Sequence, residues 1–128
     1  MLPAQHRLRT GADLRAVIRG RGAVRAGSRL LVVHATTTDS RAGCPPRIGF
    51  VVSKAVGGAV VRNRVKRRLR AQTAALLGSI PAGVDLVVRA QPASSAADSA
   101  TLGAELRRLL TVVMTRVQGS DAGLRGVR

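Results

Sequence analysis

The sequence predicts an α+β fold in which a small sheet packs against helices in the order α–β–β–β–α–β–α. Two observations carry this prediction: short runs rich in Val, Leu and Ile are typical of strands, and longer segments repeat apolar residues at helical spacing. A length of 128 residues fits one domain, which we place at residues 1–118, with a basic disordered tail at residues 119–128. Since the chain has one Phe and neither Trp nor Tyr, small aliphatic side chains fill the core.

The first predicted element is a short helix. Residues 1–11 are basic and are expected to be loosely held. Over residues 13–19, Leu14, Val17 and Ile18 fall on one helix face, and two arginines fall on the other. Glycines at positions 20 and 22 end this helix, because glycine tolerates the backbone conformation of a helix C-terminus.

Strands and a loop follow this helix. Residues 22–27 form a short strand or an irregular crossing, whereas residues 29–37 are rich in Leu and Val and form a strand. Residues 38–46 contain Asp, Ser, Gly and two prolines, which predicts a loop. Residues 47–53 form the central strand, and alternation directs one set of its side chains the same way: Ile48, Phe50 and Val52.

The C-terminal part adds two helices and a strand. A helix over residues 59–77 ends at a glycine, and a strand follows at residues 84–90. In that strand Asp85 and Arg89 lie on the face opposite Leu86 and Val88. Small and polar residues at 91–99 then connect to a last helix, which the apolar periodicity places at residues 100–117.

The most strongly basic stretch runs from Ser53 to Arg70 and reads SKAVGGAVVRNRVKRRLR. Within it Val65 and Leu69 lie four positions apart, in a seam with Val61, Thr73 and Leu76 that faces the core. The polar positions form three rows on the rest of the helix: Arg62 with Lys66 and Arg70, Asn63 with Arg67, and Arg64 with Arg68.

This charge pattern predicts a polyanionic partner. Like charges four positions apart weaken a helix by about 0.2–0.5 kcal/mol per pair, and the stretch contains no acid that offsets them. Phosphates on a partner relieve the repulsion and release counterions. Because the chain carries a net charge of +16, nucleic acid is the leading class of partner and an anionic membrane surface the second. A solvated basic face without a partner is the alternative.

The sequence shows no catalytic or metal-binding constellation. His34 has no acidic partner close in sequence, His6 lies in the N-terminal segment, and the six acids lack the spacing of an acid–base pair or a metal clamp. The single Cys44 excludes an internal disulfide. No apolar run is long enough to span a membrane, and the N-terminus lacks the apolar core of a signal peptide. We therefore expect a cytoplasmic binding protein with no membrane partner.

The basic stretch resembles the signature of the bacterial ribonuclease P protein component, and the matching string is VGGAVVRNRVKRRLR. More loosely, the opening LPAQHRLRTGADLRAV is similar to the family's basic N-terminal helix, and VDLVVRA to its fourth strand. The resemblance implies the same element order, in a topology like domain 2 of ribosomal protein S5 with a left-handed β–α–β crossover. General rules for sheets favour a right-handed crossover in about 98% of cases.

The resemblance also implies a function. It makes the chain the RNA-binding protein subunit of an endoribonuclease that removes the 5′ leader from precursor tRNA. Its partners are then the catalytic RNA subunit and precursor tRNA. The RNA subunit performs the hydrolysis, so no catalytic residue and no metal ligand is expected on the protein. Mg²⁺ is expected on the RNA subunit and the substrate, and no cofactor is held by the protein alone.

Two sets of site residues follow from the resemblance. The residues expected to contact RNA are Lys54, Arg62, Asn63, Arg64, Lys66, Arg67, Arg68 and Arg70. A groove for the leader, between the first helix and the sheet, is expected to be lined by Leu14, Ile18, Val33, Phe50, Val52 and Arg89. The family's groove has aromatic residues where this chain has aliphatic ones. Since stacking of a base on an aromatic ring contributes about 1–3 kcal/mol, leader binding here rests on aliphatic contact and charge.

Two other classes of protein share some of these features. A ribosomal or ribosome-associated RNA-binding protein has similar charge, but it does not need an Arg-Asn-Arg helix directly after a strand that ends in Ser-Lys. A DNA-binding module usually packs a second short helix before its recognition helix, whereas a strand precedes the basic helix here. The nucleic acid that co-purifies with the protein separates these classes.

Overall fold

The computed structural model describes residues 11–19, 23–37 and 43–126. Its elements follow the predicted order α–β–β–β–α–β–α, with two short 3₁₀ turns, η3 and η4, in addition. Their bounds are α1 Gly11–Arg19, β1 Val24–Gly27, β2 Leu31–Thr37, β3 Arg47–Val51, α2 Ala59–Leu76, η3 Leu77–Ser79, β4 Val84–Ala90, η4 Pro92–Ala96 and α3 Ser99–Gly126. The segment at residues 22–27, for which the sequence left two alternatives, thus contains a strand.

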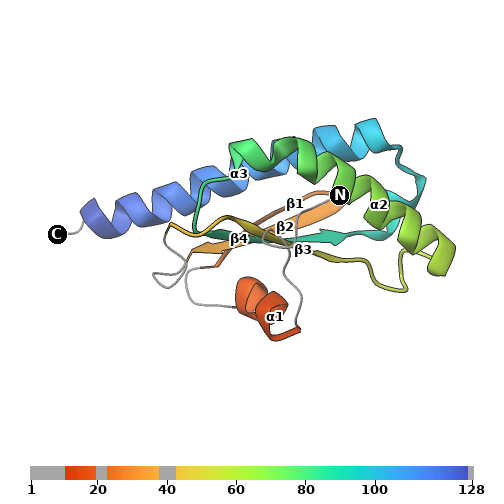
Figure 1. The fold of residues 1–128 in the computed structure, drawn as a ribbon, viewed down its shortest axis with the longest axis horizontal. Helices are drawn as coiled ribbons and strands as arrows, with labels where there is room; N and C mark the ends of the chain where they lie inside the picture. Colours follow the sequence, from red (N-terminus) through yellow and green to blue (C-terminus); the bar gives the residue numbers. More distant parts are fainter. Residues whose placement is uncertain (1–10, 20–22, 38–42, 127–128) are drawn as a thin grey trace.

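The strands form one sheet in the order β1-β2-β4-β3. β2 is antiparallel to both β1 and β4, and β3 is parallel to β4. The parallel neighbours β3 and β4 are joined through α2, so these three elements form a β–α–β crossover. Figure 1 shows α2 and α3 on one side of the sheet and α1 on the other. The sheet therefore has two covered faces with different helices.

The face beneath α2 and α3 holds the main core. Alternate residues of the strands point into it, so that Val33, Ile48, Leu86 and Val88 are all at most 1% exposed. The helices contribute further buried aliphatic side chains: Val65 and Leu69 from α2, and Leu102, Leu106, Leu109 and Val113 from α3. The alternation predicted for the third and fourth strands is confirmed on this face.

The face beneath α1 holds a smaller core. Val17 of α1 packs on Val87 of β4, and Leu14, Ile18 and Val51 surround this pair. Next to it an ion pair bridges the parallel strands, because the register places Arg47 opposite Asp85. Arg47 Nε donates to Asp85 Oδ1 at 3.1 Å and Nη2 donates to Oδ2 at 2.7 Å, the two-point geometry that favours arginine over lysine.

The turn between β3 and α2 requires glycine at one position. Gly57 has a φ of +157°, and a Cβ there would lie 2.9 Å from Val61 Cβ and Cγ1. Gly58 then acts as the N-cap of α2 in an extended conformation, without a side-chain hydrogen bond. Glycine at position 57 therefore lets the strand approach the first turn of the basic helix closely.

The last helix differs from its prediction. α3 extends to Gly126, whereas the sequence placed its end at residue 117 and a disordered tail at residues 119–128. The segment contains glycines but no proline. Glycine costs a helix about 1 kcal/mol relative to alanine, whereas proline costs about 3 kcal/mol, so this segment can continue the helix.

Within the described ranges, no helix combines the length and apolar character needed to cross a membrane.

His34 of β2 lies on the α1 face of the sheet. Its side chain is 3% exposed, and Nε2 finds no hydrogen-bond partner among the described residues. Arg25 of β1 lies opposite it in the register, and Arg89 lies on β4. Burial lowers the pKa of His34 below its ordinary value of 6.5, and the charges of Arg89 and Arg25 lower it further. The folded chain therefore favours the neutral imidazole.

We expect Val65→Ala and Leu69→Ala each to lower the free energy of unfolding by about 1–4 kcal/mol, through lost burial and a cavity. Both side chains are 0% exposed. Val60→Ala is the matched control, since Val60 lies on the same helix but is 80% exposed, and a surface change of this kind stays within about 0.5 kcal/mol. Denaturant titrations measure the three values. Equal losses for Val60 and Val65 would show that α2 is rotated.

We expect stability to fall as the pH is lowered through 6.5, because the unfolded chain binds a proton at His34 there and the folded chain resists it. The free energy of unfolding is unaffected by His34 above the pKa of His34 in the unfolded chain. It then falls with decreasing pH until the pH reaches the lower pKa of His34 in the folded chain. Urea midpoints between pH 7.5 and pH 5 measure it, with His34→Gln as the comparison. If the urea midpoints of the wild-type protein and of His34→Gln change with pH in the same way, His34 is not the cause of the pH dependence.

Candidate nucleic-acid interface

The basic helix α2 packs with the phase that the sequence predicts. Its buried residues are Val65, Leu69 and Thr73, with relative exposures of 0–1%, and Val61 and Leu76 pack partly buried against the same core. The polar rows therefore face away from the sheet. Among them Asn63, Arg67 and Arg70 are exposed, and Arg62, Arg64, Lys66 and Arg68 are half-buried at the flanks.

The three rows differ in what they contact. Arg64 Nη2 donates to the carbonyl oxygen of Ser95 at 3.2 Å, and Arg68 Nη1 donates to the carbonyl oxygen of Ala97 at 2.7 Å. These two arginines thus face the segment that links β4 to α3. The sequence placed them in the same class as the other basic residues of the helix, because their partners lie about thirty positions farther along the chain.

The other two rows are open. Within the part of the chain that the structure describes, no side-chain hydrogen bond or ion pair engages Arg62, Asn63, Lys66, Arg67 or Arg70. Lys54 is exposed in the turn that precedes α2. Because α2 contains no acid, these side chains form a cationic surface without internal compensation. Such a surface suits a row of phosphates.

The residues predicted for the leader groove do not lie together. Leu14 and Ile18 lie at the α1 face, and Arg89 of β4 is exposed on the same face as Val87. Val33, Phe50 and Val52 belong to the core beneath α2 and α3, on the opposite face. The prediction is therefore wrong for these three as neighbours of α1. A shift of one position along a strand moves a side chain to the other face.

The α1 face of the sheet presents other strand residues than Val33, Phe50 and Val52. The register aligns Arg25, His34, Val87 and Gly49 across the four strands, and the adjacent row contains Val32, Arg89 and Val51. Arg25 and Arg89 are exposed on either side of the buried His34. Alternation from the buried Leu31 and Ala35 of β2 is the sequence signal that separates His34 from Val33.

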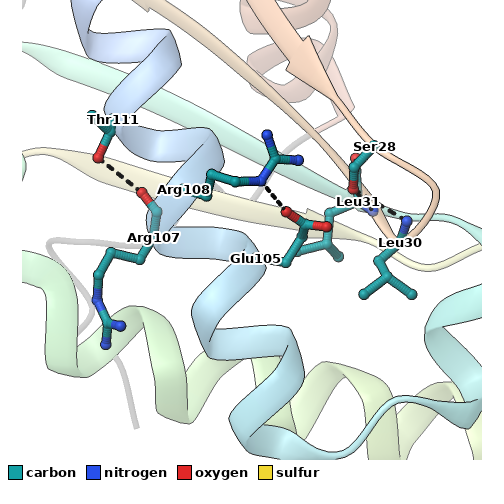
Figure 2. Close-up of polar contacts among 7 residues, drawn as sticks. All are labelled: Ser28, Leu30, Leu31, Glu105, Arg107, Arg108 and Thr111. Atoms are coloured by element: carbon teal, nitrogen blue, oxygen red, sulfur yellow. Dashed lines mark hydrogen bonds and ion pairs between the residues drawn. The ribbon is translucent and has the colours of Figure 1, made fainter.

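A third feature is a hollow beside α3. A hollow of about 460 Å³ opens between the first half of α3 and the β1–β2 turn, lined by Leu30, Ala100, Thr101, Ala104, Glu105 and Arg108. Figure 2 shows Arg108 turned toward Glu105, with which it forms a 2.6 Å ion pair, and Leu30 across from them beside Ser28. In residues 11–19, 23–37 and 43–126, no group of three His, Cys, Asp or Glu side chains could hold a metal ion.

A family model and two similar proteins point to the same family. A family model described as Ribonuclease P matches residues 2–114. The ribonuclease P protein component of a Nocardioides species is 50% identical over 120 residues, which cover 93% of this chain and 100% of the relative. The corresponding protein of Acidothermus cellulolyticus is 53% identical over 111 residues, which cover 86% of this chain and 89% of the relative.

Solved structures agree with the sequence comparison. The RNase P protein from Thermotoga maritima superimposes with a TM-score of 0.67 at 26% identity, over 84% of this chain and 94% of that chain. The RNase P protein of Staphylococcus aureus gives a TM-score of 0.72 at 23% identity, again over 84% and 94%, which supports the fold. By its family match, its curated relatives and its fold, the chain belongs to the ribonuclease P protein family.

Proposed function

We propose that the chain is the RNA-binding protein subunit of ribonuclease P, which removes the 5′ leader from precursor tRNA. The observation that carries this proposal is the open cationic surface of α2, formed by Arg62, Asn63, Lys66, Arg67 and Arg70, in a chain that belongs to the ribonuclease P protein family. Precursor tRNA is made in the bacterial cytoplasm, so the proposed substrate places the chain there.

In this proposal the catalytic RNA subunit performs the hydrolysis, and Mg²⁺ acts on the RNA and the substrate. The protein contributes affinity and positioning. Supporting this division, the acids with described side-chain contacts are engaged in structural roles: Asp85 with Arg47, Glu105 with Arg108, and Asp98 with the first turn of α3. A water-activating pair of carboxylates needs side chains that are free to act on a substrate.

We assign the open rows of α2, together with Lys54, to the catalytic RNA. A helix with stacked like charges binds a polyanion favourably, since each neutralised phosphate releases a counterion. The planar guanidinium groups of Arg62, Arg67 and Arg70 can each grip a phosphate at two points. Asn63 lies among them and adds a donor and an acceptor without charge.

We assign the α1 face to the single-stranded leader. Arg25 and Arg89 provide charge at the sheet surface, and Leu14, Ile18 and Val51 provide aliphatic contact beside them. Because α1 and α2 lie on opposite sides of the sheet, one subunit can engage the catalytic RNA and the leader at the same time (Figure 1). A ribosomal RNA-binding role is not favoured, since the similar proteins are ribonuclease P protein components.

The decisive experiment is reconstituted cleavage. We expect the protein with the family's catalytic RNA and Mg²⁺ to remove the leader from precursor tRNA at a salt concentration where the RNA alone is slow. The protein freed of RNA should show no cleavage, because no side chain performs the chemistry. Cleavage by RNA-free protein would overturn the division of roles, and failure to stimulate the RNA would overturn the proposed function.

The reconstituted enzyme also tests whether the α1 face binds the 5′ leader. Arg89→Ala should reduce the affinity of the reconstituted enzyme for precursor tRNA while leaving its affinity for mature tRNA unchanged. Arg107→Ala is the matched control, since Arg107 is an exposed arginine on α3. Equal losses for precursor and mature tRNA in the Arg89 variant would place the leader elsewhere.

A second prediction concerns the two kinds of side chain on the open rows. Arg62→Ala, Lys66→Ala and Arg70→Ala should each lower the dependence of log K on log salt by about 0.7–0.9. Asn63→Ala should keep that slope and weaken binding about two- to tenfold, the equivalent of one hydrogen bond. Filter binding of the catalytic RNA across a salt series measures both. If all four variants bind the catalytic RNA with wild-type affinity, α2 does not contact that RNA and is a solvated basic face.

A further inference from the structure

We propose that the row formed by Arg64, Arg68 and Gln72 on α2 is a positioning device that fixes this helix on the start of α3, and that it does not contact RNA. This inference rests on the proposed function of α2. The arginines of this helix fall into two groups: Arg64 and Arg68 contact the β4–α3 connection, and the arginines of the open rows do not.

The two arginines of the row bind main-chain atoms of the β4–α3 connection. Arg64 Nη2 lies 3.2 Å from the carbonyl oxygen of Ser95, within η4, and Arg68 Nη1 lies 2.7 Å from the carbonyl oxygen of Ala97, the residue that ends η4. The amide of Ala97 in turn donates to the carbonyl oxygen of Ser94. The guanidinium groups therefore add contacts from α2 to a short turn that also has hydrogen bonds of its own, such as the one from Ser94 Oγ to the carbonyl oxygen of Gln91.

Gln72 continues the row by one helical turn. Its Nε2 donates to Ser99 Oγ at 2.9 Å, at the first residue of α3. A Cβ at Gly103 would lie 2.2 Å from Gln72 Oε1, so the glutamine side chain passes directly over the backbone of α3. Positions 64, 68 and 72 are spaced four apart, and all three face the same partner segment.

The surroundings of Arg68 also disfavour a phosphate. Asp98 caps α3 by accepting a 2.7 Å hydrogen bond from the amide of Thr101. The hydrogen bonds from Thr101 lower the pKa of Asp98, and the charge of Arg68 lowers it further. This carboxylate is thus ionised at neutral pH, and it belongs to the residue that follows Ala97, whose carbonyl oxygen Arg68 contacts. A phosphate on Arg68 would meet that negative charge.

Arg67 supplies the contrast. It is adjacent to Arg68 in sequence, but its side chain is exposed on the open row that it forms with Asn63, and it makes no hydrogen bond within the described part of the chain. The RNA-binding surface of α2 is therefore narrower than its charge suggests. It consists of the two open rows, and the third row sets the angle at which they are presented.

Two matched substitutions test this inference. Arg67→Gln and Arg68→Gln each replace a charged guanidinium by a neutral amide that can still donate a hydrogen bond, and the two positions are adjacent. We expect Arg67→Gln to lower the salt slope for binding the catalytic RNA by about 0.7–0.9 and Arg68→Gln to leave it unchanged. Equal decreases for both variants would overturn the positioning role. An unchanged slope for Arg67→Gln would instead count against RNA contact by the open row of Asn63 and Arg67, and hence against the proposed function of α2.

The positioning role has its own readout. Arg68→Ala removes the donor, so it should speed amide hydrogen exchange in residues 94–103 and weaken RNA binding about two- to tenfold at an unchanged salt slope. Arg68→Gln should rescue both effects, because it restores a donor toward Ala97. If Arg68→Ala does not fold, Arg64→Ala and Arg64→Gln provide the same comparison at Ser95. Exchange rates like those of wild type in the alanine variants would contradict the proposal.

Discussion

Burial of Val65, Leu69 and Thr73 beneath α2 is the contact on which the rest of the structure depends. A helix with this many like charges and no acid is weakened by its own repulsion, and the whole chain carries a net charge of +16. The two aliphatic side chains are completely buried, and the hydroxyl of Thr73 donates to the carbonyl oxygen of Leu69 at 2.7 Å. The one polar side chain of the seam, Thr73, is therefore hydrogen-bonded, and the charged rows lie on the rest of the helix.

The sheet extends this arrangement to a second surface. The central strands β2 and β4 are buried on both faces, as Val33 and Val88 on one side and His34 and Val87 on the other show. Helices α2 and α3 cover the first face, and the short α1 covers part of the second (Figure 1). Since α1 is only nine residues long, basic residues at the margins of its face stay exposed. One small domain thereby presents two cationic surfaces in different directions.

The three acids with described side-chain contacts stabilise the fold at places that do not face the open rows of α2. Asp85 pairs with Arg47 across parallel strands, Glu105 pairs with Arg108 along α3, and Asp98 caps α3 next to Arg68. Each of these three carboxylates lies near a positive charge, whereas the open rows of α2 contain no acid. Arginine consequently has two uses on α2: it binds main-chain carbonyls where the helix meets η4, and it remains available to phosphates elsewhere.

The sequence by itself determined the element order, the family and the phase of α2, because apolar periodicity and turn residues act over a few positions. It also located the surface that carries the open charge. Only the tertiary structure decided which face of β2 lies beneath α1 and which lies beneath α2 and α3, and that Arg64 and Arg68 are engaged. The partners of those arginines lie 31 and 29 positions away. Charge and spacing along a helix do not reveal such partners, because the partners are brought next to α2 only by the tertiary fold.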